Sequence, residues 1–303
     1  MYLSENDIRA LLTYEALIPA IRQALIDYSA GLVDQPPRTI LRAGNAQGSN
    51  NGWFAVMPVV AGDAMCVKTV TFYPGNAALG LPTHMAVIEL LRRSTGEPLA
   101  SMDGRLITEM RTAAVSAVAL DALAAPNVRT LGILGSGVQA RAHIQALRLV
   151  RPALSEIRIW SRTPANAALL AKETCARSVS IEETAAADVV VTVTSSAVPV
   201  LQGRWLASRA VVLAVGATGS SLRELDDDAM QSSAVVAESR ACVERESGDV
   251  RLSGVRVQAE IGEILAGTAA APSGPRLVFK SVGMAIEDLT AARLVWHAHR
   301  APH

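Results

Sequence analysis

The segment Thr130–Ala140 is the part of this chain that most constrains its fold. Its apolar first half runs directly into Gly135-Ser136-Gly137-Val138-Gln139-Ala140, and a helical pattern follows at once. In this order of strand, glycine turn and helix, the spacing of the two glycines and the alanine indicates a dinucleotide-binding βαβ unit. Gly135 permits the turn, Gly137 lets the backbone approach a pyrophosphate, and Ala140 keeps the helix close to the sheet. The alternative is a purely structural glycine turn.

Phosphate groups are expected at the start of the helix that follows this turn, because backbone amides and the helix dipole favour anions there. The cofactor contacts predicted in the turn are Gly135, Ser136, Gly137, Val138 and Gln139.

The end of the second expected strand of this domain indicates which nucleotide binds. An acidic residue there would hold the 2′-hydroxyl of the adenosine ribose and repel a 2′-phosphate. The strand instead ends in Ser161-Arg162-Thr163, where a guanidinium and two hydroxyls can hold a phosphate. We therefore predict that NADPH is preferred and that NADH binds more weakly. The alternative reading of Arg162 is an ordinary exposed arginine.

The amino-acid composition limits which classes of partner and which cellular compartment are expected. The 303 residues include 28 Lys and Arg and 28 Asp and Glu, so net charge offers nothing that attracts nucleic acid or an acidic membrane. The apolar runs are short, and the first residues do not resemble a signal peptide. Three scattered cysteines, Cys66, Cys175 and Cys242, suit a reducing compartment. We expect a cytoplasmic protein with no membrane or nucleic-acid partner and no metal.

The pattern of helices and strands predicted for the N-terminal third indicates a separate domain. Two helices are expected before Gly31, and residues 35–39 should be extended. Strands are predicted at 53–58, 64–72, 85–91 and 99–104, the last two forming a hairpin. Parallel βαβ units do not have this spacing. The sequence thus predicts a mostly antiparallel α+β domain over residues 1–112.

The rest of the chain alternates between strands and helices. A helix at 108–124 should carry the chain into a Rossmann domain over residues 113–279. Its strands are expected at 128–134, 157–160, 189–194, 210–215, 234–237 and 278–283.

Three basic residues, Lys68, Arg38 and Arg111, occur at positions where a positive charge suggests an anionic partner. Lys68 lies inside an apolar strand, and burying an ammonium is unfavourable without an anion; a solvent-facing edge strand is the alternative. Arg38 follows two prolines that stiffen its loop, which suits a carboxylate clamp as well as an ordinary loop arginine. Arg111 is expected near the start of an alanine-rich helix, where the dipole disfavours a cation. Its expected anionic partner is a substrate carboxylate or the cofactor pyrophosphate, and both remain open.

As a set, these residues resemble the ornithine cyclodeaminase/μ-crystallin family over almost the whole chain. The segments that carry the resemblance are Gln35-Pro36-x-Arg38-Thr39, Val56-Met57-Pro58, Lys68-x-Val70-Thr71-Phe72-Tyr73, Thr108-x-x-Arg111-Thr112-Ala113-Ala114, Gly135–Ala140, Val215-Gly216-Ala217, Glu224-Leu225-Asp226, Glu246-Ser247-Gly248-Asp249-Val250 and Val278-Phe279-Lys280-Ser281-Val282-Gly283-Met284-Ala285-x-Glu287-Asp288. The resemblance implies a homodimer in which the N-terminal domain, completed by residues 280–303, forms the dimer interface and the substrate site. It also implies hydride transfer to or from an amino- or imino-acid carbon, in a cleft against the Rossmann domain.

The resemblance assigns further roles residue by residue. It implies that Lys68 is catalytic and contacts substrate, and that the other substrate contacts are Arg38, His84, Arg111, Thr218 and Val282. For His84, a structural hydrogen bond is an equally good reading. Further cofactor contacts are implied at Thr194, Val215 and Ser281, which lie where strands end or a helix begins.

Two positions are similar to the ketimine-reductase branch rather than to the cyclodeaminases. Ala55 and Thr218 stand where cyclodeaminases carry carboxylates. Cyclising ornithine requires groups that move protons on amines and water, whereas a ready-made protonated imine requires fewer. The expected activity is NADPH-dependent reduction of Δ1-pyrroline-2-carboxylate to L-proline, with the six-membered Δ1-piperideine-2-carboxylate as a further substrate. The alternatives are an ornithine cyclodeaminase, an amino-acid or iminosuccinate dehydrogenase, and a non-enzymatic NADPH-dependent binding protein.

Overall fold

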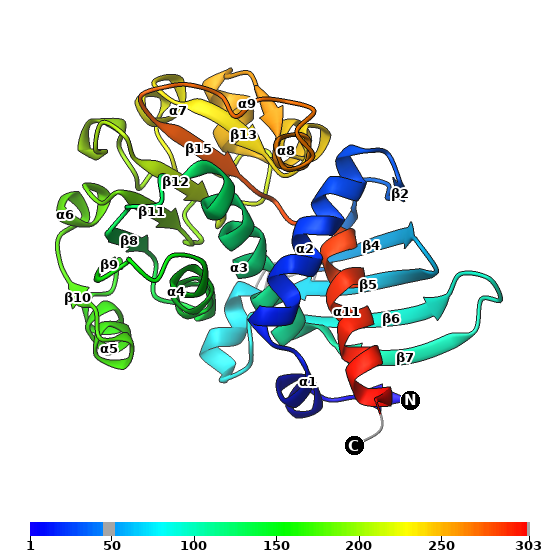
Figure 1. The fold of residues 1–303 in the computed structure, drawn as a ribbon. Coiled ribbons are helices and arrows are strands. Elements are labelled where there is room, and N and C mark those ends of the chain that lie inside the picture. The colour runs from blue at the N-terminus through cyan, green and yellow to red at the C-terminus, as the bar shows by residue number, and fades with distance from the viewer. Residues whose placement is uncertain (45–51, 302–303) are drawn as a thin grey trace. The chain divides into compact units, whose positions relative to one another are not determined.

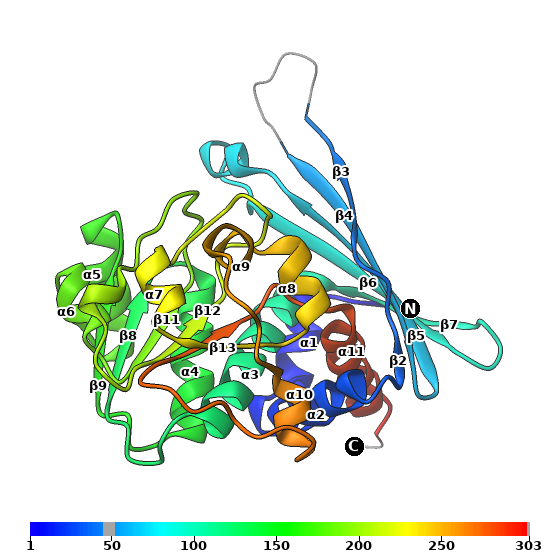
Figure 2. The ribbon, with the colours of Figure 1, turned by 90° about the horizontal axis from the view of Figure 1, so that it is seen from above.

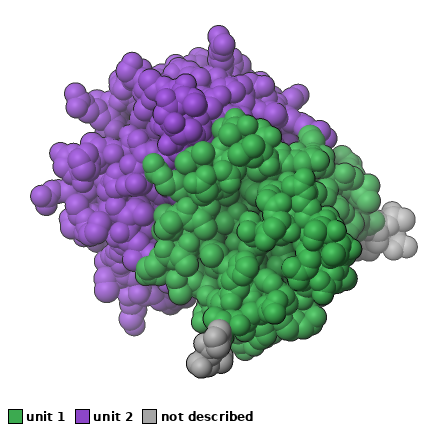
Figure 3. All heavy atoms as spheres, turned by 45° about the vertical axis from the view of Figure 1, so that its right-hand side comes forward, with its two compact units in different colours: residues 1–112, 284–303 green, residues 113–283 purple. Residues whose placement is uncertain are grey.

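The computed structural model describes residues 1–44 and 52–301, and the chain divides into two compact units. Unit 1 consists of Met1–Thr112 and Met284–His303, and unit 2 of Ala113–Gly283 (Figure 3). The second boundary thus follows Gly283 rather than residue 279. Val282 and Gly283 remain with unit 2 because their amides donate to Glu238 of that unit.

Unit 1 is built on a mostly antiparallel sheet. Its strands are β1 (Tyr2–Leu3), β2 (Val33–Asp34), β3 (Thr39–Arg42), β4 (Trp53–Ala61), β5 (Ala64–Phe72), β6 (His84–Arg92) and β7 (Pro98–Asp103). They are ordered β1-β7-β6-β5-β4-β2, with β3 also on β4, and among these described strands only the β1–β7 pair is parallel. The four expected strands and the β6–β7 hairpin are confirmed. The short strands β1, β2 and β3 were not expected.

The edge of this sheet is interrupted where two prolines occur. Strands β2 and β3 pair with opposite ends of β4, and Gln35–Arg38 between them have no regular structure. A proline has no amide hydrogen to donate, so Pro36 and Pro37 cannot continue the ladder. The break leaves Arg38 next to the strand that carries the family-like Val56-Met57-Pro58 segment.

Helices cover one face of this sheet. The first is α1 (Glu5–Leu11), which Ser4 and Asp7 begin with a reciprocal capping box. Helices α2 (Tyr14–Ser29) and α11 (Ala285–Arg300) lie side by side, and α11 packs on β4, β5 and β6 (Figures 1 and 2). A short helix, η1 (Pro74–Leu79), connects β5 to β6. Alternate residues of the three strands are therefore buried, which places Lys68 on the covered face.

Helix α3 (Gly104–Leu123) runs from unit 1 into unit 2. It begins at Gly104, not at Thr108 as expected. A Cβ at Gly104 would lie 2.7 Å from that of Ala86, so a glycine lets the helix start directly against β6. Arg111 consequently lies two turns inside the helix, and the argument from an unfavourable position at its start is wrong.

Unit 2 contains an eight-stranded parallel sheet, as expected for a Rossmann domain. Its strands are β8 (Thr130–Leu134), β9 (Glu156–Trp160), β10 (Arg177–Ser178), β11 (Val189–Thr192), β12 (Val211–Ala214), β13 (Ala234–Ala237), β14 (Ala259–Glu260) and β15 (Leu277–Lys280). The order is β10-β9-β8-β11-β12-β15-β13-β14. The six expected strands are confirmed, and β10 and β14 are additional. The chain reverses direction across the sheet between β8 and β11, which is where such sheets bind dinucleotides.

Helices connect these strands. They are α4 (Val138–Val150), α5 (Pro164–Thr174), α6 (Ile181–Ala185), η2 (Gly203–Trp205), α7 (Asp227–Gln231), α8 (Arg240–Glu246), α9 (Gly248–Ser253) and α10 (Ile261–Leu265). A hydrophobic core joins the sheet to α6, η2, α7 and α9. Within residues 1–44 and 52–301, no helix has the length and hydropathy needed to cross a bilayer.

Candidate active site

A buried ion cluster lies in unit 1, between β5, α3 and α11. Lys68 is 1% exposed and Asp288 is fully buried. Nζ of Lys68 lies 2.7 Å from Oδ2 of Asp288. Nζ also lies 3.4 Å from Oγ1 of Thr108. Arg111 places its Nε 3.2 Å from Oδ1 of the same aspartate and pairs through a second nitrogen with Glu287. Two cations and two carboxylates thus form one network.

The two carboxylates come from the first turn of α11. A helix dipole favours anions at this end, so the local sequence suits a helix start. The side chain of Gln35 accepts a hydrogen bond of 2.8 Å from the Ile286 amide and so helps to cap the turn. Gln35 immediately precedes the proline break that carries Arg38.

Burial and neighbouring charges tune the titratable groups. Desolvation lowers the pKa of Lys68 to about 8, with Asp288 opposing the shift and the charges of Arg111 and Arg38 adding to it. Desolvation also lowers the pKa of His84 to about 4, helped by the charges of Lys68 and Arg111. His84 is therefore neutral at neutral pH. The ion pairs of the cluster join two cations, Lys68 and Arg111, to two carboxylates, Glu287 and Asp288, and the charge of Arg38 also acts on Lys68.

The cluster bears on two expectations. Lys68 is buried, as the reading of an ammonium that needs an anion indicated, and its anion is the carboxylate of Asp288. Arg111 pairs with Glu287 and Asp288, two carboxylates that were not among its expected anionic partners. Carboxylates are therefore present beside Lys68, contrary to the inference from Ala55 and Thr218, but both are engaged in ion pairs.

Sequence reasoning missed Glu287 and Asp288 as members of the site. Both occur in a segment that carries the family resemblance, but acids in a first helical turn are normally explained by the helix dipole. One signal was available. The sequence predicted a buried lysine that needs an anion, and Glu287 and Asp288 were two candidate anions within a segment that carries the family resemblance.

The glycine turn of unit 2 has the geometry expected of a phosphate site. Gly135 has φ of 130°, and a Cβ there would lie 2.7 Å from the Val193 carbonyl oxygen. At Gly137, in contrast, a Cβ would have no described atom within 4 Å. Gly137 also begins α4 without a side-chain cap from the described residues. The backbone therefore offers amides and open space, which fit a pyrophosphate.

The other predicted cofactor residues extend this site along the sheet edge. Oγ of Ser136 donates to Oγ of Ser161 at 2.9 Å, which connects the glycine turn to the end of β9. Arg162 and Thr163 are exposed just beyond it, Val138 is exposed, and Gln139 is half-buried. These positions leave the arginine accessible to a phosphate on the adenosine ribose.

The remaining predicted contacts follow the strands on the other side of β8. Thr194 and Val215 were expected within strands but lie just beyond them, since β11 ends at Thr192 and β12 at Ala214. Ser281 follows β15, and its amide donates to the Ala214 carbonyl at 3.1 Å. Thr218 is half-buried in the loop after β12, and Val282 is buried. The predicted substrate residues are thus divided between the units: Arg38, Lys68, His84 and Arg111 in unit 1, and Thr218 and Val282 in unit 2.

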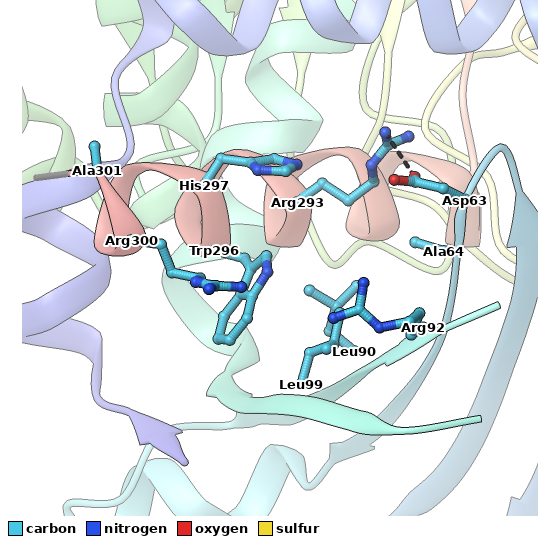
Figure 4. A pocket seen from close by; sticks show the side chains of 10 residues that line it. All are labelled: Asp63, Ala64, Leu90, Arg92, Leu99, Arg293, Trp296, His297, Arg300 and Ala301. Carbon is cyan, nitrogen blue, oxygen red and sulfur yellow. Dashed lines mark ion pairs between the residues drawn. The ribbon is translucent and has the colours of Figure 1, made fainter. Parts of the chain in front are cut away.

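A surface pocket of about 370 Å³ lies elsewhere in unit 1, between α11 and the strands β5, β6 and β7. Arg300 stacks over Trp296 in it, and Arg293 pairs with Asp63 at 2.8 Å (Figure 4). The described residues that line it are Asp63, Ala64, Leu90, Arg92, Leu99, Arg293, Trp296, His297, Arg300 and Ala301, none of which belongs to the ion cluster.

Comparison with known proteins identifies the relatives of this chain. The model of the ornithine cyclodeaminase/mu-crystallin family matches residues 1–301. The ketimine reductase mu-crystallin of Mus musculus is 40% identical, over 97% of this chain and 96% of that protein. The Δ1-pyrroline-2-carboxylate/Δ1-piperideine-2-carboxylate reductase of Azospirillum brasilense is 38% identical, over 95% and 92%. The structure of Thermococcus litoralis Δ1-pyrroline-2-carboxylate reductase with NADH and L-proline superposes with a TM-score of 0.93 at 33% identity, covering 98% of this chain and 97% of that one.

Proposed function

Because the chain belongs to the ornithine cyclodeaminase/mu-crystallin family, we propose that it reduces cyclic ketimines with NADPH. It is an oxidoreductase that acts on carbon–nitrogen bonds with a nicotinamide cofactor. The proposed substrates are Δ1-pyrroline-2-carboxylate, which yields L-proline, and Δ1-piperideine-2-carboxylate, which yields L-pipecolate. Relatives of the chain are named for both of these reactions.

The observation that carries this proposal is the buried ammonium of Lys68, which Asp288 holds in a cluster that also contains Arg111, with the charge of Arg38 acting on it. A cyclic imino acid brings one carboxylate, which these cations would attract. Arg38 and Arg111 are the proposed carboxylate partners, since their charges act on Lys68. Arg38 is only half-buried, beside the proline break, so part of its side chain remains accessible to solvent.

The proposed chemistry needs one hydride and one proton. The hydride would come from NADPH held by the glycine turn, and its acceptor would be C2 of the carbon–nitrogen double bond. The Lys68 ammonium, whose pKa is about 8, can give a proton to the ring nitrogen near neutral pH and regain one from solvent. Asp288 favours the charged form of Lys68 and fixes the direction of its ammonium. Where the imine arrives already protonated, the same ammonium would instead hold the substrate carboxylate.

The residues that would hold the cofactor are those of the glycine turn and the end of β9. The amides that begin α4 would bind the pyrophosphate, and Gly137 leaves room for it. Arg162 would pair with the 2′-phosphate, and that contact is the basis of the proposed preference for NADPH over NADH.

Three rival functions rest on the same scaffold. A cyclodeaminase is disfavoured because Ala55 is fully buried, Thr218 has no carboxylate, and both Glu287 and Asp288 already pair with cations. An amino-acid or iminosuccinate dehydrogenase would use the same cation cluster with an open-chain substrate. A binding protein without catalysis would not need Lys68 together with Arg38 and Arg111, so the presence of all three argues against it.

We also propose that the protein is a homodimer that forms through the open face of the unit 1 sheet. Most of the residues that alternate with the buried ones along β4, β5 and β6 are apolar, with Thr69, Thr71 and Glu89 as polar exceptions. Met85 and Val87 on this face are 40% and 39% exposed. Apolar patches of this kind typically mark protein interfaces. Light scattering of the purified protein would test this, and a monomer at all concentrations would contradict it.

The function is tested by a screen of NADPH consumption over cyclic and open-chain imino acids. We expect consumption with the five- and six-membered cyclic substrates and formation of the corresponding L-amino acid, quantified by chromatography. A preference for iminosuccinate or for pyruvate with ammonia would favour the dehydrogenase rival. Cofactor binding without turnover of any imine would favour the binding protein.

A further inference from the structure

Glu224 occupies an unusual position at the carboxyl edge of the unit 2 sheet. The side chain is completely buried and accepts five hydrogen bonds. Its Oε1 accepts from the amide and the hydroxyl of Thr194, at 2.6 and 2.7 Å. Its Oε2 accepts from the Thr192 hydroxyl at 2.8 Å and from the amides of Gly216 and Ala217, at 2.8 and 3.1 Å. One carboxylate therefore holds the loops that follow both β11 and β12.

The hydrogen bonds favour the ionised form of Glu224, since three of the five partners are backbone amides, which can only donate. Burial raises the pKa of Glu224, and Lys280 and the donors from Thr194 and Thr192 oppose that shift. The loops are shaped for close contact, since a Cβ at Gly216 would lie 2.3 Å from the Thr194 carbonyl oxygen and 2.6 Å from Oε1 of Glu224.

A second layer fixes Glu224 itself. Oδ1 of Asp249 accepts from the amides of Glu224 and Leu225, at 2.8 and 3.0 Å. Oδ2 of Asp249 lies 3.0 Å from Nζ of Lys280, which also donates to the Ala217 carbonyl at 3.0 Å. Lys280 ends β15, so the network extends over the ends of three neighbouring strands. None of these groups belongs to the phosphate turn or to the ion cluster.

The place of this network relative to the cofactor follows from the fold. In a doubly wound sheet the dinucleotide lies across the carboxyl ends of the strands, with its pyrophosphate at the first glycine turn. The adenosine half lies toward β9, where Ser161 and Arg162 are found. The nicotinamide half must then lie toward β11 and β12, over the loops that Glu224 holds.

We propose that Glu224 is a positioning residue that shapes the nicotinamide subsite by holding the loops after β11 and β12. This inference rests on the proposed function, because it needs a nicotinamide cofactor on unit 2. It predicts that the carboxylate matters for binding the nicotinamide half of NADPH and not for binding the adenosine half.

The test compares two ligands in variants of the full-length protein. NADPH carries both halves, whereas 2′-phospho-ADP-ribose carries only the half that binds the glycine turn and Arg162. Calorimetry should show that Glu224→Gln raises the Kd of NADPH about tenfold or more, as expected when hydrogen bonds to a charged group are lost. The Kd of 2′-phospho-ADP-ribose should stay within about twofold of wild type.

Thr194→Val is the milder variant, since it removes one hydroxyl donor and keeps the size of the side chain. Thr194→Val should raise the Kd of NADPH about threefold and lower kcat. The Kd of 2′-phospho-ADP-ribose should not change. Asp226→Ala is the matched control. Asp226 lies two residues after Glu224, and its side chain caps the start of α7. Removing this cap should lower the melting temperature without changing the Kd of either ligand.

The outcomes separate the inference from the proposed function. A wild-type protein that binds neither ligand contradicts the proposed function. Wild-type binding with unchanged NADPH affinity in both Glu224→Gln and Thr194→Val overturns the inference. Equal weakening of both ligands in Thr194→Val also overturns it, because Glu224 would then support the whole domain and not the nicotinamide subsite.

Discussion

Nζ of Lys68 lies 2.7 Å from Oδ2 of Asp288, and both side chains are almost completely removed from solvent. One comes from the middle strand of the unit 1 sheet and the other from the first turn of the last helix. Removing one member of a buried ion pair typically costs about 3–5 kcal/mol, because it leaves an uncompensated charge. Arg111 also contacts Asp288, so the loss of Lys68 alone leaves that carboxylate paired.

We expect Lys68→Ala to lose more activity than stability. Removing a proton donor typically lowers kcat by about a hundredfold or more, while Arg111 should keep Asp288 neutralised and the chain folded. Circular dichroism and NADPH titration should show a folded, cofactor-binding protein with little ketimine reduction. Lys68→Met keeps the length of the side chain without the charge and serves as the control for packing. Turnover near wild type in Lys68→Ala would mean that the active site lies elsewhere.

The activity should fall as pH rises through the pKa of Lys68, about 8, because the ammonium is the active form. Asp288 raises that pKa, so Asp288→Asn should move the alkaline limb of kcat/KM to lower pH. The measurement is a kcat/KM profile for wild type and variant across the alkaline range. A limb that stays in place, or moves to higher pH, would show that Asp288 does not control the titrating group.

The two glycines of the phosphate turn should respond differently to the same substitution. Gly135→Ala places a side chain at a φ of 130° and 2.7 Å from a carbonyl oxygen, so it should destabilise the fold by about 1–3 kcal/mol. Gly137→Ala meets open space among the described atoms and should leave the melting temperature unchanged. Its methyl group would occupy the space of the pyrophosphate, so the Kd of NADPH should rise. If Gly137→Ala binds NADPH as tightly as wild type, the phosphates do not lie at this turn.

Arg162→Asp should narrow or reverse the preference for NADPH. The change removes a phosphate partner and adds a repelling charge, and a charge-assisted contact is worth roughly 1.5–3 kcal/mol. A shift of about tenfold or more in the ratio of kcat/KM for the two cofactors is expected. The ratio is measured with one imine at saturation. Equal kinetics with NADH and NADPH in the unmodified protein would remove the basis of this prediction.

Ornithine should not be a substrate. The positions that carry acids in cyclodeaminases hold Ala55 and Thr218, and the carboxylates of Glu287 and Asp288 pair with Arg111 and Lys68. Each missing acid–base group should lower the rate by about a hundred- to ten-thousandfold. Incubation with ornithine and NAD should therefore give no detectable proline or ammonia, whereas Δ1-pyrroline-2-carboxylate and NADPH should give proline. Robust proline formation from ornithine would show that one of the paired carboxylates takes over this chemistry.

Features that depend on neighbouring residues could be predicted from the amino-acid sequence. The glycine turn and the longer strands of both sheets follow from short-range periodicity and turn chemistry, whereas the short strands β1, β2, β3, β10 and β14 carry too little of a pattern. The sequence also indicated that Lys68 is buried and needs an anion, because an ammonium within an apolar strand is unfavourable without one.

Which distant groups meet depends on the packing of the whole chain. Strand β15 inserts between β12 and β13, so that Lys280 reaches Asp249 and Ala217, and no local pattern encodes that order. Asp288 meets Lys68 because α11 packs across β5. Acids in a first helical turn are already explained by the helix dipole, and a glutamate after a loop resembles a surface residue. Their partners lie far along the chain, and only packing of the whole chain brings those charges together.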